Sequence, residues 1–281
     1  MQMAKVFGLM TAMTLILVAF GQYMGGSSGA VLAFVVALVM NFGTYWFSDR
    51  AVLRMYRARV VGPEDAPELY RMVDRLRQKA DLPMPTVGIT PSQQPNAFAT
   101  GRNAEHAVVC VTIGLMNALN ERELEGVIAH ELAHVKHRHM LVGTVAAAMA
   151  GAIGLFASIA RWGVILGTGR DSDRGNPLAL LLMAIVAPIA AVIVQMAISR
   201  QNEFQADATA ARMTGDKRGL ASALQRIEAT AKQIPMEVNP AAAHMAIINP
   251  FSSGRAPAFT GLFRTHPPTE DRVAALEALE L

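Results

Sequence analysis

Four long apolar stretches dominate the pattern of hydrophobic and polar positions along this 281-residue chain. None of them contains Asp, Glu, Lys or Arg. Each is close in length to the roughly 20 helical residues that cross a hydrocarbon core. They run over Val6–Met24, Ala30–Phe47, Met140–Ala160 and Pro177–Ile198. The pattern predicts about four transmembrane helices, arranged as two hairpins.

Other interpretations of these stretches exist. The first could be a cleaved signal peptide, because Lys5 precedes it and small residues follow it. A second apolar stretch follows at once, which favours a retained hairpin. The third and fourth are rich in Ala and Gly, a composition that suits packed membrane helices and also helices buried in protein. Neighbouring helices can accommodate Pro188 within a span, and we interpret both stretches as spans.

The basic residues give the predicted spans an orientation. The loop Gly25–Gly29 has no Lys or Arg, whereas four arginines directly follow the second stretch: Arg50, Arg54, Arg57 and Arg59. Lys136 and Arg138 precede the third stretch, and Arg200 follows the fourth. With four crossings these residues share one side, which the positive-inside rule makes cytoplasmic. The loop that carries Arg161, Arg170 and Arg174 disagrees.

Between and after the spans, the pattern is typical of a folded α+β region. Apolar positions on one stripe of Glu64–Lys79 predict an amphipathic helix. Short β-branched runs predict strands at Thr86–Thr90 and Ala107–Thr112. Asn120 and Glu123 form a capping-box pattern that opens a further helix. Later segments predict three helices and a long loop: Arg200–Met213, Lys217–Lys232, Thr269–Leu279 and, before the last helix, Pro235–Thr265.

Composition narrows the class of protein. Hydrophobic residues make up 52% and charged residues 17% of the chain, whereas soluble domains carry about 25% charged residues. The net charge of +3 comes from basic residues scattered beside apolar runs, with no nucleic-acid recognition motif. A single cysteine, Cys110, excludes an internal disulfide and a cysteine-based zinc cluster. In its apolar run this thiol fits a small core residue.

The strongest chemical signal is His130-Glu131-Leu132-Ala133-His134. Residues four apart on a helix project from the same face, so His130 and His134 can bind one metal ion. Glu131 lies beside the first ligand and can act as general base on a zinc-activated water that attacks a peptide carbonyl. The motif falls on a predicted helix and indicates one Zn²⁺ per subunit.

A catalytic zinc needs a third protein ligand and an open fourth position. The predicted hairpin of the third and fourth spans returns the chain to the same membrane face, which brings Glu203 close to His134. Asp207, one helical turn later, is placed to hydrogen-bond the outer nitrogen of a ligand histidine. His137 and His139 continue the same helix as His134, which carries them away from the metal.

With these motifs in place, the chain resembles the HtpX family of membrane-bound heat-shock metalloproteases, relatives of the CAAX prenyl endopeptidases. The resemblance covers the amino-terminal apolar pair and four motifs: Asn96–Gly101, His130–His134, Ser199–Asp207 and Thr265-His266-Pro267-Pro268. It implies a gluzincin-type fold, an active-site helix beside a small sheet with Glu as third ligand. It also implies cleavage of misfolded or damaged membrane proteins at the cytoplasmic face of a bacterial inner membrane.

The resemblance suggests further roles. The segment with Asn96, Ala97 and Phe98 and the strand Ala107–Thr112 would line the substrate cleft, where an extended peptide could add to a sheet edge; turn or core duty is the alternative. His266 would steady the oxyanion or be a buried structural histidine. Two other positions stay open: Arg272 could pin this loop or pair with Glu270, and His139 stands where many relatives carry Asp.

We therefore expect an integral, multi-pass membrane zinc endopeptidase of the α+β class. Its predicted parts are a transmembrane hairpin (1–47), the first part of the catalytic domain (48–139), a second hairpin (140–198) and the second part of the catalytic domain (199–281). The expected partners are the lipid bilayer and unfolded or membrane-protein substrates, with no nucleic acid. Alternatives are a catalytically inactive zinc-bound scaffold and a CAAX-type processing protease. A channel or transporter would carry ionisable residues within its spans, and these spans have none.

Overall fold

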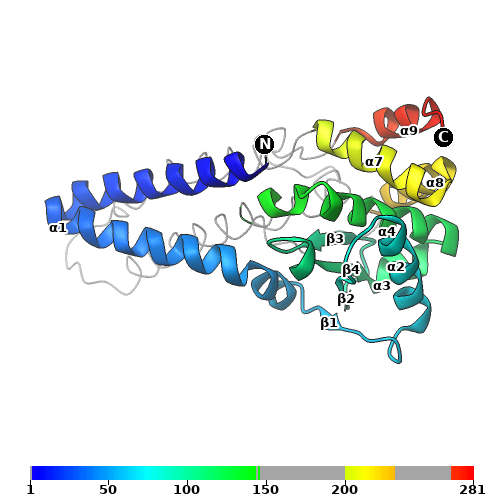
Figure 1. The fold of residues 1–281 in the computed structure, drawn as a ribbon, viewed down its shortest axis with the longest axis horizontal. Helices are drawn as coiled ribbons and strands as arrows, with labels where there is room; N and C mark the ends of the chain where they lie inside the picture. Colours follow the sequence, from blue (N-terminus) through cyan, green and yellow to red (C-terminus); the bar gives the residue numbers. More distant parts are fainter. Residues whose placement is uncertain (1, 144, 146–199, 232–266) are drawn as a thin grey trace, which may run out of the picture.

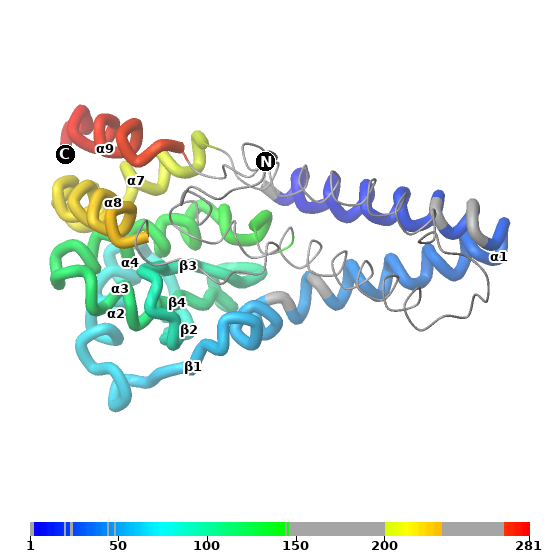
Figure 2. The backbone as a smooth tube through the Cα atoms, turned by 180° about the vertical axis from the view of Figure 1, so that it is seen from behind, coloured from blue at the N-terminus to red at the C-terminus, as the bar shows by residue number. Residues whose placement is uncertain are grey.

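The computed structural model describes residues 2–143, 145, 200–231 and 267–281. Most of the third predicted span, all of the fourth, the loop Pro235–Thr265 and His266 lie outside these residues. The described part is mostly helical with one small mixed sheet (Figures 1 and 2). These features agree with the predicted α+β class.

Helix α1 (Gln2–Met55) is an apolar hairpin that extends away from the rest of the molecule (Figure 1). Its two legs meet at Gly26, whose φ of 58° lies in the left-handed region that glycine adopts without steric cost. Midway along the legs, Asn41 Nδ2 donates to Thr14 Oγ1 at 2.9 Å and joins them.

One helix among the described residues, Gly25–Phe47, is long and apolar enough to cross a membrane by length and composition. Met3–Ala19 is apolar but shorter. Large apolar side chains of the longer segment face outward, with Val39 67% exposed. The structure thus supports one candidate span, and the number four stays a prediction.

The sheet lies at the base of the hairpin (Figure 2). Its strands are β1 (Arg59–Val60), β2 (Thr86–Thr90), β3 (Ala97–Thr100) and β4 (Val108–Thr112), in the order β1-β2-β4-β3. β2 and β4 pair in parallel, and the outer strands pair antiparallel to them. β3 is therefore an edge strand. It turns into the next loop at Gly101, whose φ of 134° and closeness to the His106 carbonyl leave no room for a Cβ atom.

Helices pack on the sheet and on one another. They are α2 (Pro67–Lys79), α3 (Ile113–Ala118), α4 (Glu121–Lys136), α7 (Arg200–Thr214), α8 (Lys217–Ala231) and α9 (Thr269–Glu277), with a 3-10 turn η1 at Ala104–His106. α4 is central: it packs against α7, α8, α2 and β3. Its buried Val127, Ile128 and Leu132 belong to the main hydrophobic core.

Two local features set the position of α4. The predicted capping box is present, because Asn120 Oδ1 accepts from the Glu123 N–H and Glu123 Oε2 accepts from the Asn120 N–H, each at 3.0 Å. Such a cap fixes where the helix starts. At Gly126 an added Cβ would lie 2.8 Å from the Leu220 backbone nitrogen. The glycine therefore lets α8 approach α4 closely.

Candidate metal centre

The candidate centre lies between α4 and α7, which run side by side in Figures 1 and 2. His130 and His134 come from one face of α4, and Glu203 comes from the first turn of α7. One potential ligand atom from each residue lies within 4.8 Å of the others. His130 and Glu203 are buried, and His134 is half-buried.

The distances suit a shared metal ion. The two Nε2 atoms of His130 and His134 lie 3.0 Å apart. Glu203 places one oxygen 3.7 Å from His130 Nε2 and the other 3.5 Å from His134 Nε2. Ligand atoms about 2.0–2.2 Å from one tetrahedral ion are separated by roughly 3.3–3.6 Å. Two imidazoles and one carboxylate are also a donor set of catalytic zinc sites, so these residues form a possible metal site.

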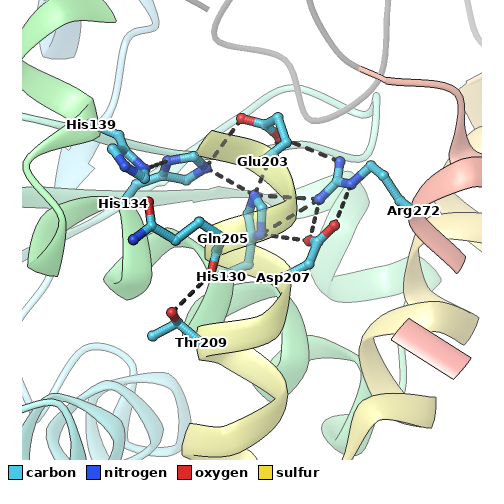
Figure 3. A network of polar contacts seen from close by, with 8 residues as sticks. All are labelled: His130, His134, His139, Glu203, Gln205, Asp207, Thr209 and Arg272. Atoms are coloured by element: carbon cyan, nitrogen blue, oxygen red, sulfur yellow. Dashed lines mark hydrogen bonds and ion pairs between the residues drawn. The ribbon is translucent and has the colours of Figure 1, made fainter. Parts of the chain in front are cut away.

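Asp207 fixes the orientation of His130 (Figure 3). Its Oδ1 lies 2.9 Å from His130 Nδ1. A proton held on Nδ1 by this contact leaves the lone pair of Nε2 directed towards His134 and Glu203, which is the tautomer a metal ligand needs. Asp207 is 2% exposed, so the pair is shielded from water. Asp207 lies one helical turn after Glu203 on α7.

Arg272 of α9 holds Asp207 in turn. The guanidinium donates from Nε to Asp207 Oδ2 at 2.8 Å and from Nη2 to Oδ1 at 2.6 Å. Nη1 lies 3.6 Å from Glu203 Oε2. Arg272 is 1% exposed and heads the largest fully buried side chains of the described residues. Its carboxylate partner is thus Asp207, and the alternative pairing with Glu270 on the surface is wrong.

The charges in this cluster stabilise one another. Burial alone would raise the pKa of Asp207, but the Arg272 guanidinium and His130 outweigh burial and lower it. Burial acts to lower the pKa of His130, whereas the hydrogen bond and charge of Asp207 raise it above the ordinary value. The pKa of Arg272 is likewise raised by its carboxylates against the effect of burial. Asp207 therefore stays ionised beside a permanently charged arginine.

His139 lies beside the site. Its Nδ1 is 3.2 Å from His134 Nδ1, so one ring donates and the other accepts (Figure 3). The helix ends at Lys136, and Arg138 adopts a φ of 58°. The chain therefore turns back instead of carrying His139 away, as the continuing helix predicted. Burial first, and then the charge of His137, lower the pKa of His139 to about 4, so the ring is neutral at pH 7.

His137 points elsewhere. Its Nε2 lies 2.9 Å from Thr209 Oγ1, and its Nδ1 lies 3.4 Å from Gln205 Nε2 on α7. These contacts join the end of α4 to α7. Burial lowers the pKa of this ring, with a smaller effect from Lys136. His137 is thus a half-buried link between the two helices.

Glu131 is 5% exposed and follows His130 on α4. Its charge reaches Cys110 on β4: burial first, and then Glu131, raise the pKa of that thiol to about 12. Cys110 is fully buried and stays protonated at neutral pH, which fits a core residue and not a nucleophile. The buried carboxylate beside the candidate ligands can serve as a proton acceptor.

The predicted cleft residues lie on or next to β3. Asn96, Ala97 and Phe98 are each no more than 3% exposed. Ala97 packs into the main core, and Phe98 packs on the opposite face of the sheet against Tyr56. Their side chains therefore do not line an open surface. His266 lies outside the described residues.

Comparison with known proteins decides the family. A model of peptidase family M48 matches residues 63–280. The chain belongs to peptidase family M48. The M48 chain is 53% identical to a protease HtpX homolog of Gemmatimonas aurantiaca over 98% of both chains. It is 54% identical to the homolog of Desulfatibacillum aliphaticivorans, over 95% of this chain and 86% of that one. The resemblance inferred from its motifs is thereby confirmed, and the M48 chain is a metallopeptidase.

Among solved structures, the M48 chain is similar to the crystal structure of Ste24p from S. mikatae. The TM-score is 0.53 at 16% identity, over 98% of this chain. The chain spans 65% of the length of that structure. At this identity the likeness concerns the fold alone, a Ste24-like fold.

The sequence pointed to Arg272 and His139 but did not predict their contacts in the site. The bond of Arg272 to Asp207 joins positions 65 apart in the chain, and no local spacing predicts it. The contact of His139 with His134 depends on the turn after Lys136. The only signal for it was that the cluster His134, His137 and His139 is dense in imidazoles.

Proposed function

We propose that this M48 metallopeptidase is a membrane-bound zinc endopeptidase whose ion is held by His130, His134 and Glu203. The observation that carries the proposal is the convergence of these side chains from α4 and α7, with candidate ligand atoms within 4.8 Å of one another. Three protein ligands leave a fourth position for water or substrate, as catalytic zinc requires.

A bound zinc ion supplies Lewis acidity: it lowers the pKa of water towards 7 and polarises a peptide carbonyl. The protein supplies the proton transfers. Glu131, buried beside His130, accepts a proton from the attacking water and donates it to the departing amine. Asp207 and Arg272 keep His130 in the tautomer that ligates. His266 is proposed to steady the oxyanion.

The substrates we propose are misfolded or damaged membrane proteins, cleaved on the cytoplasmic side of a bacterial inner membrane. The candidate span Gly25–Phe47 supports membrane attachment. The exposed arginines directly after it support the cytoplasmic orientation. Among the described strands, β3 lies at the edge of the sheet, where an extended substrate can add as a further strand. Two helical hairpins that alternate with two parts of one catalytic domain remain the proposed organisation.

The decisive experiment compares Glu131→Gln with wild type. Glutamine keeps the shape of the side chain and both histidines but removes the basic oxygen. Bound zinc, measured by mass spectrometry, should be unchanged, whereas cleavage of an unfolded membrane protein should fall by about 10²- to 10⁴-fold. Glu125→Gln is the matched control, because Glu125 lies on the same helix and pairs with Arg75 at 3.2 Å on the surface. Wild-type cleavage by Glu131→Gln would leave an unassigned base, and no cleavage by zinc-loaded wild type would favour an inactive scaffold.

A further inference from the structure

The carboxyl end of α1 packs against one face of the sheet, where it contacts β3 and β4. Val52, Phe98, Val108 and Cys110 are each no more than 4% exposed and form one small hydrophobic cluster. Tyr56 adds its ring to this cluster, with its centroid 4.6 Å from that of Phe98. Aromatic pairs at this spacing contribute packing beyond their buried area. Helix α1 and the edge strand therefore share a core.

A second contact lies closer to the candidate span. The guanidinium carbon of Arg102 lies 4.8 Å from the centre of the Trp46 ring, a cation–π arrangement. Trp46 is next to the last residue of the span Gly25–Phe47 and is 43% exposed. Tryptophan at the end of a span lies at the level of the lipid headgroups. Arg102, two residues after β3, is therefore held at that level.

The arginines that follow the candidate span also suit a position at the level of the lipid headgroups. Arg50, Arg54, Arg57 and Arg59 are all exposed. Within the described part of the chain, none of them forms an ion pair with a carboxylate. Exposed arginines that directly follow a span suit the phosphates of a membrane surface.

The metal site lies beside the same end of β3. Helix α4 packs on β3, and Val135, next to the candidate ligand His134, shares a small hydrophobic cluster with Ala99, Ala104 and Ala107. Because Ala99 and Ala104 lie on either side of Arg102 in the chain, His134 lies close to the segment that Arg102 holds at the headgroup level.

We propose that the site acts on extended polypeptide that directly adjoins a membrane anchor, close to the headgroups. The inference rests on the proposed membrane-bound protease and specifies its substrates as juxtamembrane segments. The rigid junction of α1 with β3 sets the reach, because neither the edge strand nor α4 can move away from the bilayer without breaking the Tyr56 and Phe98 core.

The test uses full-length enzyme in liposomes with substrates that differ only in a rigid spacer. Each substrate is a transmembrane helix, a polyproline spacer of 3, 6 or 12 residues, and one unfolded segment that the enzyme cleaves as a soluble peptide. At about 3.1 Å per residue these spacers hold the segment roughly 9, 19 or 37 Å from the membrane. Cleavage should be at least about tenfold faster with the shortest spacer than with the longest. Equal rates, or the fastest rate with the longest spacer, would overturn the inference.

Arg102→Gln tests the junction itself. Removing its contact with Trp46 should reduce the preference for the short spacer, while zinc content and cleavage of the soluble peptide stay at wild-type values. Arg50→Gln is the matched control, because Arg50 lies 6.0 Å from Phe47 on its own helix and does not join α1 to the sheet. An unchanged preference in Arg102→Gln contradicts the proposed role of this contact. Failure of zinc-loaded enzyme to cleave even the soluble peptide would instead contradict the proposed function.

Discussion

Helices α1 and α4 depart from the usual distribution of side chains in opposite directions. On α1, large apolar side chains are exposed, with Val35 50%, Phe42 61% and Val39 67% accessible. On α4, the ionisable His130 and Glu131 are no more than 5% exposed. A contiguous apolar surface is unfavourable in water and stable against lipid. A buried charge is unfavourable unless other charges surround it. One chain thus contains a surface suited to a bilayer and an interior suited to an ion.

The largest effect should follow from removing the ligand that α7 brings to α4. Glu203→Ala takes away one of three proposed donors, so bound zinc should fall far more than in Asp207→Asn. The latter keeps all three donors and should lose about 10- to 100-fold in affinity. Zinc content and chelator competition measure both variants. Full occupancy in Glu203→Ala would move the third ligand to another residue.

The buried cluster of charges can be tested at Arg272. Arg272→Met leaves the buried carboxylate of Asp207 without its two hydrogen bonds, and removing one partner of a buried pair costs about 3–5 kcal/mol. The melting temperature of the metal-free protein should therefore fall. Adding Asp207→Asn should restore part of this stability, because the uncompensated charge is then gone. A double variant no more stable than Arg272→Met would contradict the pairing as the source of the loss.

The exposed apolar surface of α1 can be tested with a charged substitution. Val35→Lys introduces a charge near the middle of the candidate span, where the insertion cost is about 2.5–3.5 kcal/mol. The fraction of protein recovered in the membrane should fall. Met55→Lys is the control, because Met55 is 40% exposed on the same helix but lies beyond Phe47. Higher yields of soluble Val35→Lys with intact zinc would show that water, and not lipid, surrounds this face.

A surface pair gives the smallest effect. Asp216 accepts from the backbone N–H groups of Arg218 and Gly219 at the start of α8 and pairs with Arg122. The Arg122 hydrogen bond, against the effect of burial, lowers the pKa of Asp216. Because the folded pKa is depressed, this stabilisation is present above the unfolded value near 4 and is lost as the pH falls through the folded pKa.

Asp216→Asn should therefore lower the melting temperature slightly at pH 7, since asparagine caps a helix as well as aspartate but cannot pair with Arg122. The difference from wild type should shrink below about pH 4. Melting curves at pH 7, 5 and 3 measure it. A difference that grows in acid would contradict the sign of the pKa shift.

Local patterns in the sequence predicted the helices and strands whose formation depends on residues close to one another in the chain. The stripe on α2, the strand Thr86–Thr90 and the capping box of α4 each follow from residues a few positions apart. Strand β1 was not predicted, because a strand of two residues is too short to show alternation of apolar and polar positions. The end of the helix after Lys136 was not predicted, because an arginine such as Arg138 does not signal the left-handed backbone conformation that it adopts.

The candidate site divides in the same way. The spacing of His130 and His134 is a property of one helix turn, so it could be found directly. The position of Glu203 required an assumption about chain reversal between residues 140 and 198, most of which lie outside the described residues. The burial of Arg272 depends on how α9 docks on α7 and α8, and a single arginine in a sequence does not reveal it.

The order of these residues along the chain has a consequence for biosynthesis. A ribosome releases α4 with both histidines first, α7 with Glu203 and Asp207 later, and α9 with Arg272 last. Until α9 emerges, Asp207 lacks the guanidinium that holds both of its oxygens. A growing chain therefore carries its histidines well before the centre is complete. The three proposed ligands are thus present once α7 has emerged, whereas the buried ion pair that orients His130 forms only with α9.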